Sequence, residues 1–324
     1  MKGLLITLAL CVPACLPTAS IGTAVIDVSL GNGCLAHFAT ASEAAEILAR
    51  KDDFIQRLSP FDRSARMKTD KNVSVEEFLA FVKTSASTWT DAEKGKVEAA
   101  IGRIGPALEV LSLPLPKTVA LLKTTGNEEG HAFYTRDTAI VFPENQLTAA
   151  ADAPPLEKTI AHELFHILSR ENPAMREALY HAIGFTPCAE VQLPTPLQPR
   201  KITNPDAPRN DHSIRLQVDG KEVAAVPMLL SATEKYDAQR GGEFFSYMQL
   251  QFLILENRSG GLGGGEVVAP SRVSQFFEQV GRNTDYVIHP EEILAENFAL
   301  LVLNEQKEAS PAILQRMREI LTRH

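Results

Sequence analysis

The sequence has no excess of basic residues, since 32 lysine and arginine residues stand against 40 aspartate and glutamate residues. The formal net charge is -8. Nucleic acids and anionic membrane surfaces are bound by clustered positive charge, so this balance argues against both as partners. Beyond the N-terminus the chain also lacks an apolar run long enough to span a bilayer, and no internal repeat is evident. Its 324 residues suit one large domain or two smaller ones.

The one strongly apolar run is at the start of the chain, MKGLLITLALCVPACLPTAS. Lys2 is followed by apolar residues and then by small ones, a pattern typical of a secretory signal peptide. We therefore predict a signal peptide at residues 1–20, cut after Ser20 or alternatively after Ala24, and export to the periplasm or the medium. Lipoprotein processing, which would leave Cys15 as a lipid anchor, is a further alternative.

Cysteine is scarce, with four residues in the whole chain. Cleavage after Ser20 would leave only Cys34 and Cys188. Two cysteines in an oxidising compartment can form a disulfide, but their separation in sequence does not tell whether these two meet.

Helical patterns dominate residues 21–116. Thr40, Ser74 and Thr90 each have a glutamate three residues later, which is the capping-box signature of a helix start. Apolar residues follow at helical spacing. Residues 117–184 begin with a strand pattern, in which Arg136-Asp137 suits a hairpin turn. Two helices are then expected, one from the prolines at 154 and 155 to about Glu171, the other from Pro173 to Ile183.

The remainder divides into a β-rich insertion at residues 185–265 and a helical region at residues 266–324. Asp219-Gly220 between alternating apolar residues predicts a hairpin. The run GEFFSYMQLQFLILE is compatible with helix or strand. The glycine-rich run SGGLGGG, residues 259–265, is predicted to be a flexible loop. Helices are expected to begin at Pro290 and Pro311. The fold class is therefore α+β.

The motif HELFH contains the residues predicted to bind a metal ion and to transfer a proton. His162 and His166 are four residues apart, so on a helix their Cβ atoms lie about 5–6 Å apart and both rings can reach one ion. Zinc binds imidazole nitrogen at about 2.0–2.1 Å. Glu163 points about 100° around the helix from His162, where it can take a proton from water at the metal.

A catalytic zinc site normally has three protein ligands and a water molecule. One familiar third ligand, a histidine six residues after the motif, is absent because Asn172 stands there, and His181 suits an ordinary amphipathic helix. HPEEILAENF is the better candidate. Glu292 and Glu296 share one helical face, so one can bind the metal while the other holds a ligand histidine by its second nitrogen. Glu291 is the alternative to Glu292.

With these two motifs the chain resembles the gluzincin metallopeptidases, the thermolysin and neprilysin-like clan. Those enzymes combine HExxH with a downstream glutamate on a second helix, often as Glu-x-x-Ala-Asp, where this chain has Glu296 in the last position. The resemblance implies a zincin-like fold with a small sheet beside the motif helix, and Zn²⁺ held by His162, His166 and Glu292. Glu163 would be the general base, and Glu296 the partner of a ligand histidine. The long separation of the two motifs implies an insertion between them.

The function expected from these residues is that of an exported zinc metallopeptidase acting on a peptide or protein substrate. Two alternatives are a binding or scaffold protein that cleaves nothing, and a zinc hydrolase of a non-peptide amide. Tyr286 and His289 are candidate oxyanion stabilisers or plain loop residues. The strand Ala139–Phe142 is expected to line the cleft and pair with an extended substrate. The other histidines are predicted to lie at the surface or in the core: His37, His131, His212 and His324.

Overall fold

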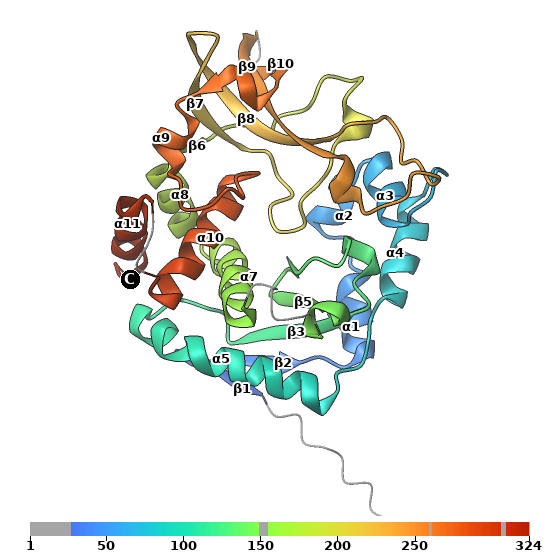
Figure 1. Cartoon of the computed structure of the whole chain (residues 1–324), viewed down its shortest axis with the longest axis vertical. Coiled ribbons are helices and arrows are strands. Elements are labelled where there is room, and N and C mark those ends of the chain that lie inside the picture. The colour runs from blue at the N-terminus through green and yellow to red at the C-terminus, as the bar shows by residue number, and fades with distance from the viewer. Residues whose placement is uncertain (1–26, 149–154, 259–260, 306–308, 324) are drawn as a thin grey trace, which may run out of the picture.

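The computed structural model describes residues 27–148, 155–258, 261–305 and 309–323. Two β-sheets lie at opposite ends of the molecule, with helices between and beside them (Figure 1). This mixture of helices and small sheets confirms the α+β class. The predicted signal peptide and Cys15 fall outside the described residues. Within the described part of the chain, no helix has the length and apolar character needed to cross a membrane.

The sheet nearer the N-terminus has five strands in the order β1-β2-β3-β5-β4. Strands β2, β3 and β5 are parallel, and the β1–β2 and β4–β5 pairs are antiparallel. A turn joins β4 and β5 as predicted, but it lies at Asp137-Thr138, one residue later than expected, with Asp137 at φ 50°. The strands are β1 (Val28–Gly31), β2 (Cys34–Phe38), β3 (Thr118–Thr124), β4 (Tyr134–Arg136) and β5 (Ala139–Pro143). The first two lie in a region expected to be helical. Both strands are short: among the described strands β1 pairs only with β2, and β2 joins the sheet by pairing with the distant β3.

Helices cover both faces of this sheet. Val119 and Leu121 of β3 point into the core formed with α5 and α7, whereas Leu122 points into the core formed with α1 and α4. This alternation is the two-residue period of a strand. All three predicted capping boxes are present. The helices are α1 (Ala41–Leu48), α2 (Asp53–Arg57), α3 (Pro60–Arg66), α4 (Val75–Thr84), α5 (Asp91–Leu111), α6 (Glu144–Leu147) and α7 (Leu156–Glu171).

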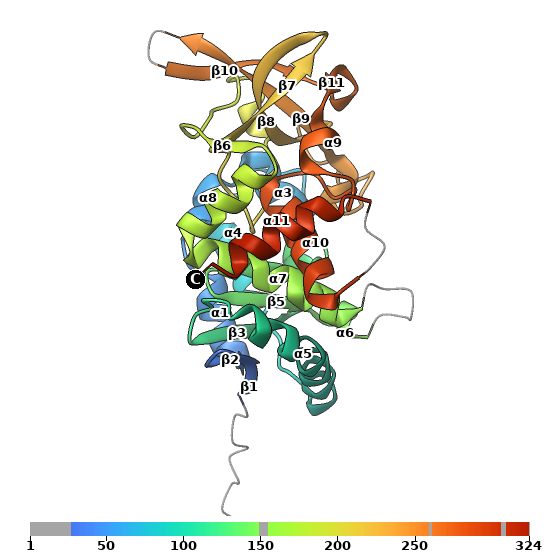
Figure 2. The same ribbon diagram turned by 90° about the vertical axis from the view of Figure 1, so that its left-hand side faces the viewer.

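The later helices lie between the two sheets (Figure 2). Helices α8 and α10 pack against α7, and α11 packs against α8 and α10. Helix α10 is buried on nearly every side, as expected for an apolar helix enclosed by others. The predicted helix starts at Pro173, Pro290 and Pro311 are confirmed, as is the end of α7 at Glu171. These helices are α8 (Pro173–Ala182), α9 (Phe276–Val280), α10 (Pro290–Leu303) and α11 (Pro311–Leu321).

The second sheet has six antiparallel strands, ordered β10-β9-β8-β7-β11 with β6 also paired to β7. The predicted turn at Asp219-Gly220 is confirmed, with both residues at positive φ. The ambiguous run from 242 to 256 forms a short 3₁₀ turn and then β9. The strands are β6 (Phe185–Pro187), β7 (His212–Val218), β8 (Lys221–Ser231), β9 (Met248–Arg258), β10 (Gly261–Val268) and β11 (Val273–Ser274). The 3₁₀ turns are η1 (Asn127–Glu129), η2 (Gln198–Arg200), η3 (Phe244–Tyr247) and η4 (Pro270–Arg272).

The prediction of a flexible glycine loop was wrong from Gly261 onward, because these glycines form β10 along the edge of β9. A Cβ added at Gly264 would lie 2.6 Å from the carbonyl oxygen of Gln192, so glycine allows close approach of the backbones there. The sheet consequently continues past residue 265 to Ser274, and the expected boundary of the β-rich insertion was too early.

The two cysteines expected to remain after export are not bonded to each other. Cys34 is buried on β2, and Cys188 follows β6 in the other sheet. Both are free thiols, so the disulfide that the sequence left open is not formed.

Arg66 is a buried residue that links α3, η1 and the connection between β6 and β7. Its guanidinium donates to both carboxylate oxygens of Glu129 at 2.7 and 2.6 Å and to Asp62 at 2.7 Å. It also donates to the carbonyl of Thr203, in the segment that leads to β7. Only 2% of the residue is exposed.

We expect Arg66→Ala to lower the free energy of unfolding by about 3–5 kcal/mol, because it leaves two buried carboxylates without their cation. Arg103→Ala is the control, since Arg103 pairs with Glu157 while more than half of its own side chain is exposed. That change should cost less than about 1 kcal/mol. Urea unfolding of the three proteins measures both effects, and equal costs would contradict this role of Arg66.

Candidate metal centre

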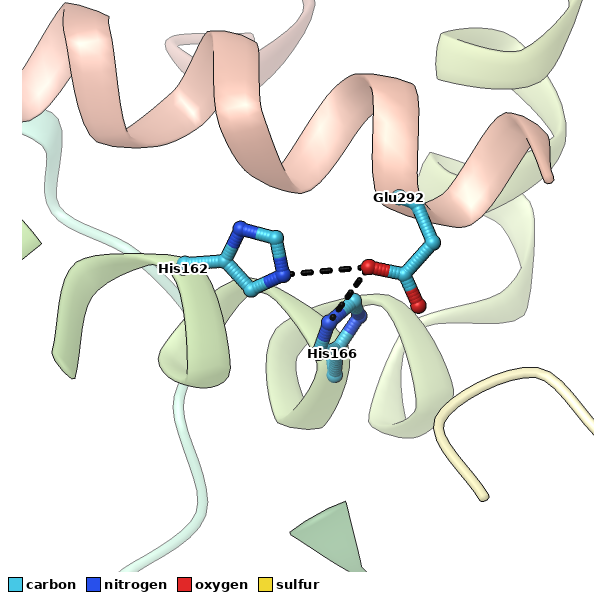
Figure 3. Close-up of side chains that lie close together, drawn as sticks. All are labelled: His162, His166 and Glu292. Atoms are coloured by element: carbon cyan, nitrogen blue, oxygen red, sulfur yellow. Dashed lines mark hydrogen bonds and ion pairs between the residues drawn. The ribbon is translucent and has the colours of Figure 1, made fainter. Parts of the chain in front are cut away.

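Helices α7 and α10 bring His162, His166 and Glu292 together (Figure 3). One carboxylate oxygen of Glu292, Oε2, lies 3.1 Å from Nε2 of His162 and 3.6 Å from Nε2 of His166. The potential ligand atoms of the three residues lie within 4.8 Å of one another. Two ring nitrogens and one carboxylate oxygen therefore face a common point, which a single cation could occupy.

The other nitrogen of each ring is held by a carboxylate. Nδ1 of His162 lies 3.0 Å from Glu296, and Nδ1 of His166 lies 3.1 Å from Glu291. Such partners fix the orientation of a ligand histidine and raise its basicity. Of the two neighbouring glutamates, then, Glu292 faces the free ring nitrogens and Glu291 lies behind His166.

Glu291 is itself fixed by two hydroxyl groups. Ser169 donates to its Oε2 at 2.8 Å and Tyr180 at 2.6 Å. Successive residues of a helix point about 100° apart, which lets Glu291 and Glu292 approach the same histidine from different directions. His289 positions this first turn, because its Nδ1 accepts the backbone N–H of Glu291 at 3.1 Å.

Two buried atoms at the centre have no hydrogen-bond partner among the described residues. They are Nε2 of His166 and Oε2 of Glu163. A buried polar atom without a partner is costly, so such atoms need an explanation. A metal ion between His162, His166 and Glu292 would satisfy the first, and a water molecule beside it would satisfy the second. Two imidazoles and a carboxylate are a donor set typical of catalytic zinc, so the residues present fit a metal ion.

The charges of the centre favour a cation. Burial lowers the pKa of His166, but the charges of Glu292 and Asp206 outweigh it and bring that pKa to about 9. Burial likewise lowers the pKa of His162, yet its bonds to Glu292 and Glu296 hold it well above the ordinary value. The carboxylates thus create a negative potential at the ring nitrogens.

Glu163 lies in a different environment. Burial, and then the negative charge of Asp206, raise the pKa of its carboxyl to about 8. The residue is 4% exposed and lines the same pocket as His162 and Glu292. Because the negative charge of this carboxylate is poorly stabilised, the group accepts a proton readily, which is the property a general base needs.

Sequence reasoning missed two residues of the site, Asn204 and Asp206. Asn204 donates to Oε1 of Glu292 at 2.5 Å, which leaves Oε2 for the histidines. Asp206 forms a second candidate metal-binding group with Glu163 and His166. Both residues lie in the irregular proline-containing connection between β6 and β7. Nothing in their local pattern marks them, because only the return of this segment to α7 and α10 brings them to the centre.

Of the two candidate oxyanion stabilisers, Tyr286 lines the pocket beside the centre and His289 does not. Tyr286 lines a pocket of about 360 Å³ beside the centre, together with Phe133, Lys158 and the acidic residues. His289 is outside that lining and is buried at the start of α10, so it serves as the cap of that helix. Phe133, just before β4, and Lys158 of α7 line the pocket only at its wall and were not among the predicted site residues.

The remaining histidines lie away from the centre. His181 is exposed on α8. His212, predicted to lie at the surface or in the core, is buried and held between Asp211 at 2.7 Å and Glu177 at 3.0 Å. His37 contacts Asp27 at 3.0 Å, and the terminal His324 lies outside the described residues.

The prediction that Ala139–Phe142 pairs with an extended substrate was wrong. These residues form β5, which lies between β3 and β4 and pairs with both. The edge strand next to β5 is β4, and the backbone N–H of its Thr135 donates to Asp206 at 2.6 Å.

Comparison with known proteins found no matching family model, no matching curated protein and no matching solved structure. The interpretation of this centre therefore depends on its own geometry and chemistry.

We expect Asn204→Leu to weaken zinc binding by about 10–100-fold, the usual cost of losing a group that orients a metal ligand. The leucine removes the donor to Glu292 while keeping a similar side-chain size. Asn145→Leu, a change at an exposed position on α6, is the control and should leave zinc binding unchanged. Competition with a chromophoric chelator measures both affinities. An unchanged affinity in Asn204→Leu would contradict the orienting role.

Proposed function

We propose that this protein is an exported zinc-dependent metallopeptidase. The observation that carries the proposal is the convergence of His162, His166 and Glu292 on one point, with each histidine held from behind by a glutamate. The HExxH motif and the downstream glutamate helix of the gluzincin resemblance support it. The signal-peptide pattern of residues 1–20 supports export.

The mechanism assigns one role to each residue. A bound zinc ion would polarise the scissile carbonyl and make a water molecule easier to deprotonate. Glu163 accepts the proton of the attacking water and passes it to the leaving amine nitrogen as the C–N bond breaks. Tyr286 lines the pocket, and its hydroxyl can donate to the carbonyl oxygen as negative charge develops there. Glu296 and Glu291 hold the histidines in place throughout.

The buried, unpartnered oxygen of Glu163 favours an enzyme over a scaffold protein. A purely structural metal site has no use for such an atom beside a pocket, whereas a general base does. A zinc hydrolase of a non-peptide amide would use the same residues, and it is distinguished only by its substrates.

The proposal is tested by incubating the purified, zinc-loaded protein with a peptide library and with a panel of acylated amines, and identifying products by mass spectrometry. We expect the protein to cleave peptides. Elemental analysis should find about one zinc ion per chain, as three protein ligands imply. Cleavage of the acylated amines alone would reassign the substrate class. Absence of bound metal would overturn the proposal.

A further inference from the structure

The pocket beside the metal centre carries surplus negative charge. It is lined by four carboxylates, those of Glu163, Asp206, Glu292 and Glu296, and by one lysine. Lys158 lies 3.1 Å from Glu296 and neutralises it. A divalent ion would offset the charges of Glu292 and Glu163. Among the described residues, no basic side chain forms an ion pair with the carboxylate of Asp206, although arginines such as Arg170 line the neighbouring pocket that Asp206 shares.

Asp206 is held in place through one oxygen of its carboxylate, Oδ1. Its Oδ1 accepts the N–H of Thr135 at 2.6 Å and the hydroxyl of Thr135 at 2.7 Å. Its backbone N–H donates to the side chain of Asn204, and its carbonyl accepts from Arg170. Among the described residues, Oδ2 has no hydrogen bond and the carboxylate has no ion pair with a basic side chain. A half-buried carboxylate in that position is stabilised by a cation supplied from outside.

Asp206 also occupies the place where a peptide would pair with the sheet. The N–H of Thr135 is the edge-strand donor that an extended substrate would use, and it is already bonded to Asp206. A substrate therefore meets a carboxylate at this edge instead of a free strand. The pocket volume of about 360 Å³ is at the lower end of the range for small-molecule sites, about 300–1,000 Å³.

We propose that Asp206 selects substrates that carry a positively charged amine beside the scissile bond. The inference depends on the proposed hydrolytic function and specifies its substrate class. The amine can belong to a free N-terminus or to a basic side chain, and both would place an ammonium group against Oδ2 of Asp206 while the carbonyl reaches the metal centre.

The test compares zinc-loaded wild-type protein, Asp206→Asn and Asp206→Glu on matched peptides. One pair differs only in a free or acetylated N-terminus, the other in lysine or norleucine beside the cleaved bond. Wild type should prefer the charged member of at least one pair by about tenfold or more in kcat/KM, as expected for one partly desolvated charge contact. Asp206→Asn should lose that preference and Asp206→Glu should keep much of it. The pair that responds identifies the source of the amine.

Asp285→Asn is the matched control, because Asp285 is an exposed acid next to Tyr286 that does not line the pocket. It should keep the full preference. A wild-type protein without preference for charge would overturn the inference, as would an Asp206→Asn variant with an unchanged preference. A uniform rise in the hydrolysis of every peptide in Asp206→Asn would also overturn it, because Asp206 would then obstruct the centre.

Binding separates failure of this inference from failure of the proposed function. Calorimetry with zinc-loaded Glu163→Gln, alone and combined with Asp206→Asn, uses the same peptide pairs. If no peptide is cleaved by wild type but the charged peptides bind more tightly only when Asp206 is present, the peptidase assignment fails and the recognition stands. Equal binding of charged and neutral peptides overturns the recognition.

Discussion

Replacing Glu163 with glutamine should reduce peptide hydrolysis by about 10²–10⁴-fold, the usual contribution of a general base. Glutamine has nearly the same shape but cannot accept the proton of the attacking water. Zinc content should stay at the wild-type level, since Glu163 is outside the group formed by His162, His166 and Glu292. The effect is therefore expected in kcat, measured on a peptide that wild type cleaves.

Glu157→Gln is the control for this change, because Glu157 is in the first turn of the same helix and pairs with Arg103 at the surface. Its activity should equal that of wild type. If Glu163→Gln were fully active, the mechanism would be wrong. If instead Glu163→Gln lost its zinc, the ion would be held by Glu163, His166 and Asp206, the other group that the structure brings together.

Replacing Glu292 with glutamine should abolish both stoichiometric zinc binding and hydrolysis. The change removes the one anionic ligand of the proposed centre. The loss of zinc affinity should therefore exceed the loss of about 10–100-fold that follows removal of a group that only orients a ligand. Zinc affinity is measured by chelator competition, and bound zinc by elemental analysis. Removal of zinc from wild type with a chelator should likewise abolish hydrolysis, and added zinc should restore it.

Glu291→Gln is the matched comparison, one residue away on the same buried helix turn. Glu291 contacts Nδ1 of His166 and two hydroxyl groups, so its loss should weaken zinc binding by about 10–100-fold and leave measurable hydrolysis. Circular dichroism verifies that both variants are folded. If Glu291→Gln lost the ion and Glu292→Gln kept it, the assignment of the third ligand would be reversed.

Local patterns in the sequence predicted much of the helical part of the fold. The capping boxes at Thr40, Ser74 and Thr90 act through hydrogen bonds within four residues, and the structure contains all three. The Asp219-Gly220 turn needs only two residues that tolerate positive φ. Strands β1 and β2 and the glycine strand β10 were missed or misread, since each forms by pairing with a segment whose identity its own residues do not reveal.

The sequence by itself determined that two imidazoles and a glutamate share one helix at metal-binding spacing, because helix geometry makes residues four apart neighbours. It did not decide between Glu291 and Glu292, nor did it indicate Asn204 or Asp206. Those assignments came from the tertiary structure alone. The direction in which α10 crosses α7 decides which glutamate faces the free ring nitrogens, and the path of the β6–β7 connection brings Asn204 and Asp206 beside them. Both depend on packing between segments far apart in the chain.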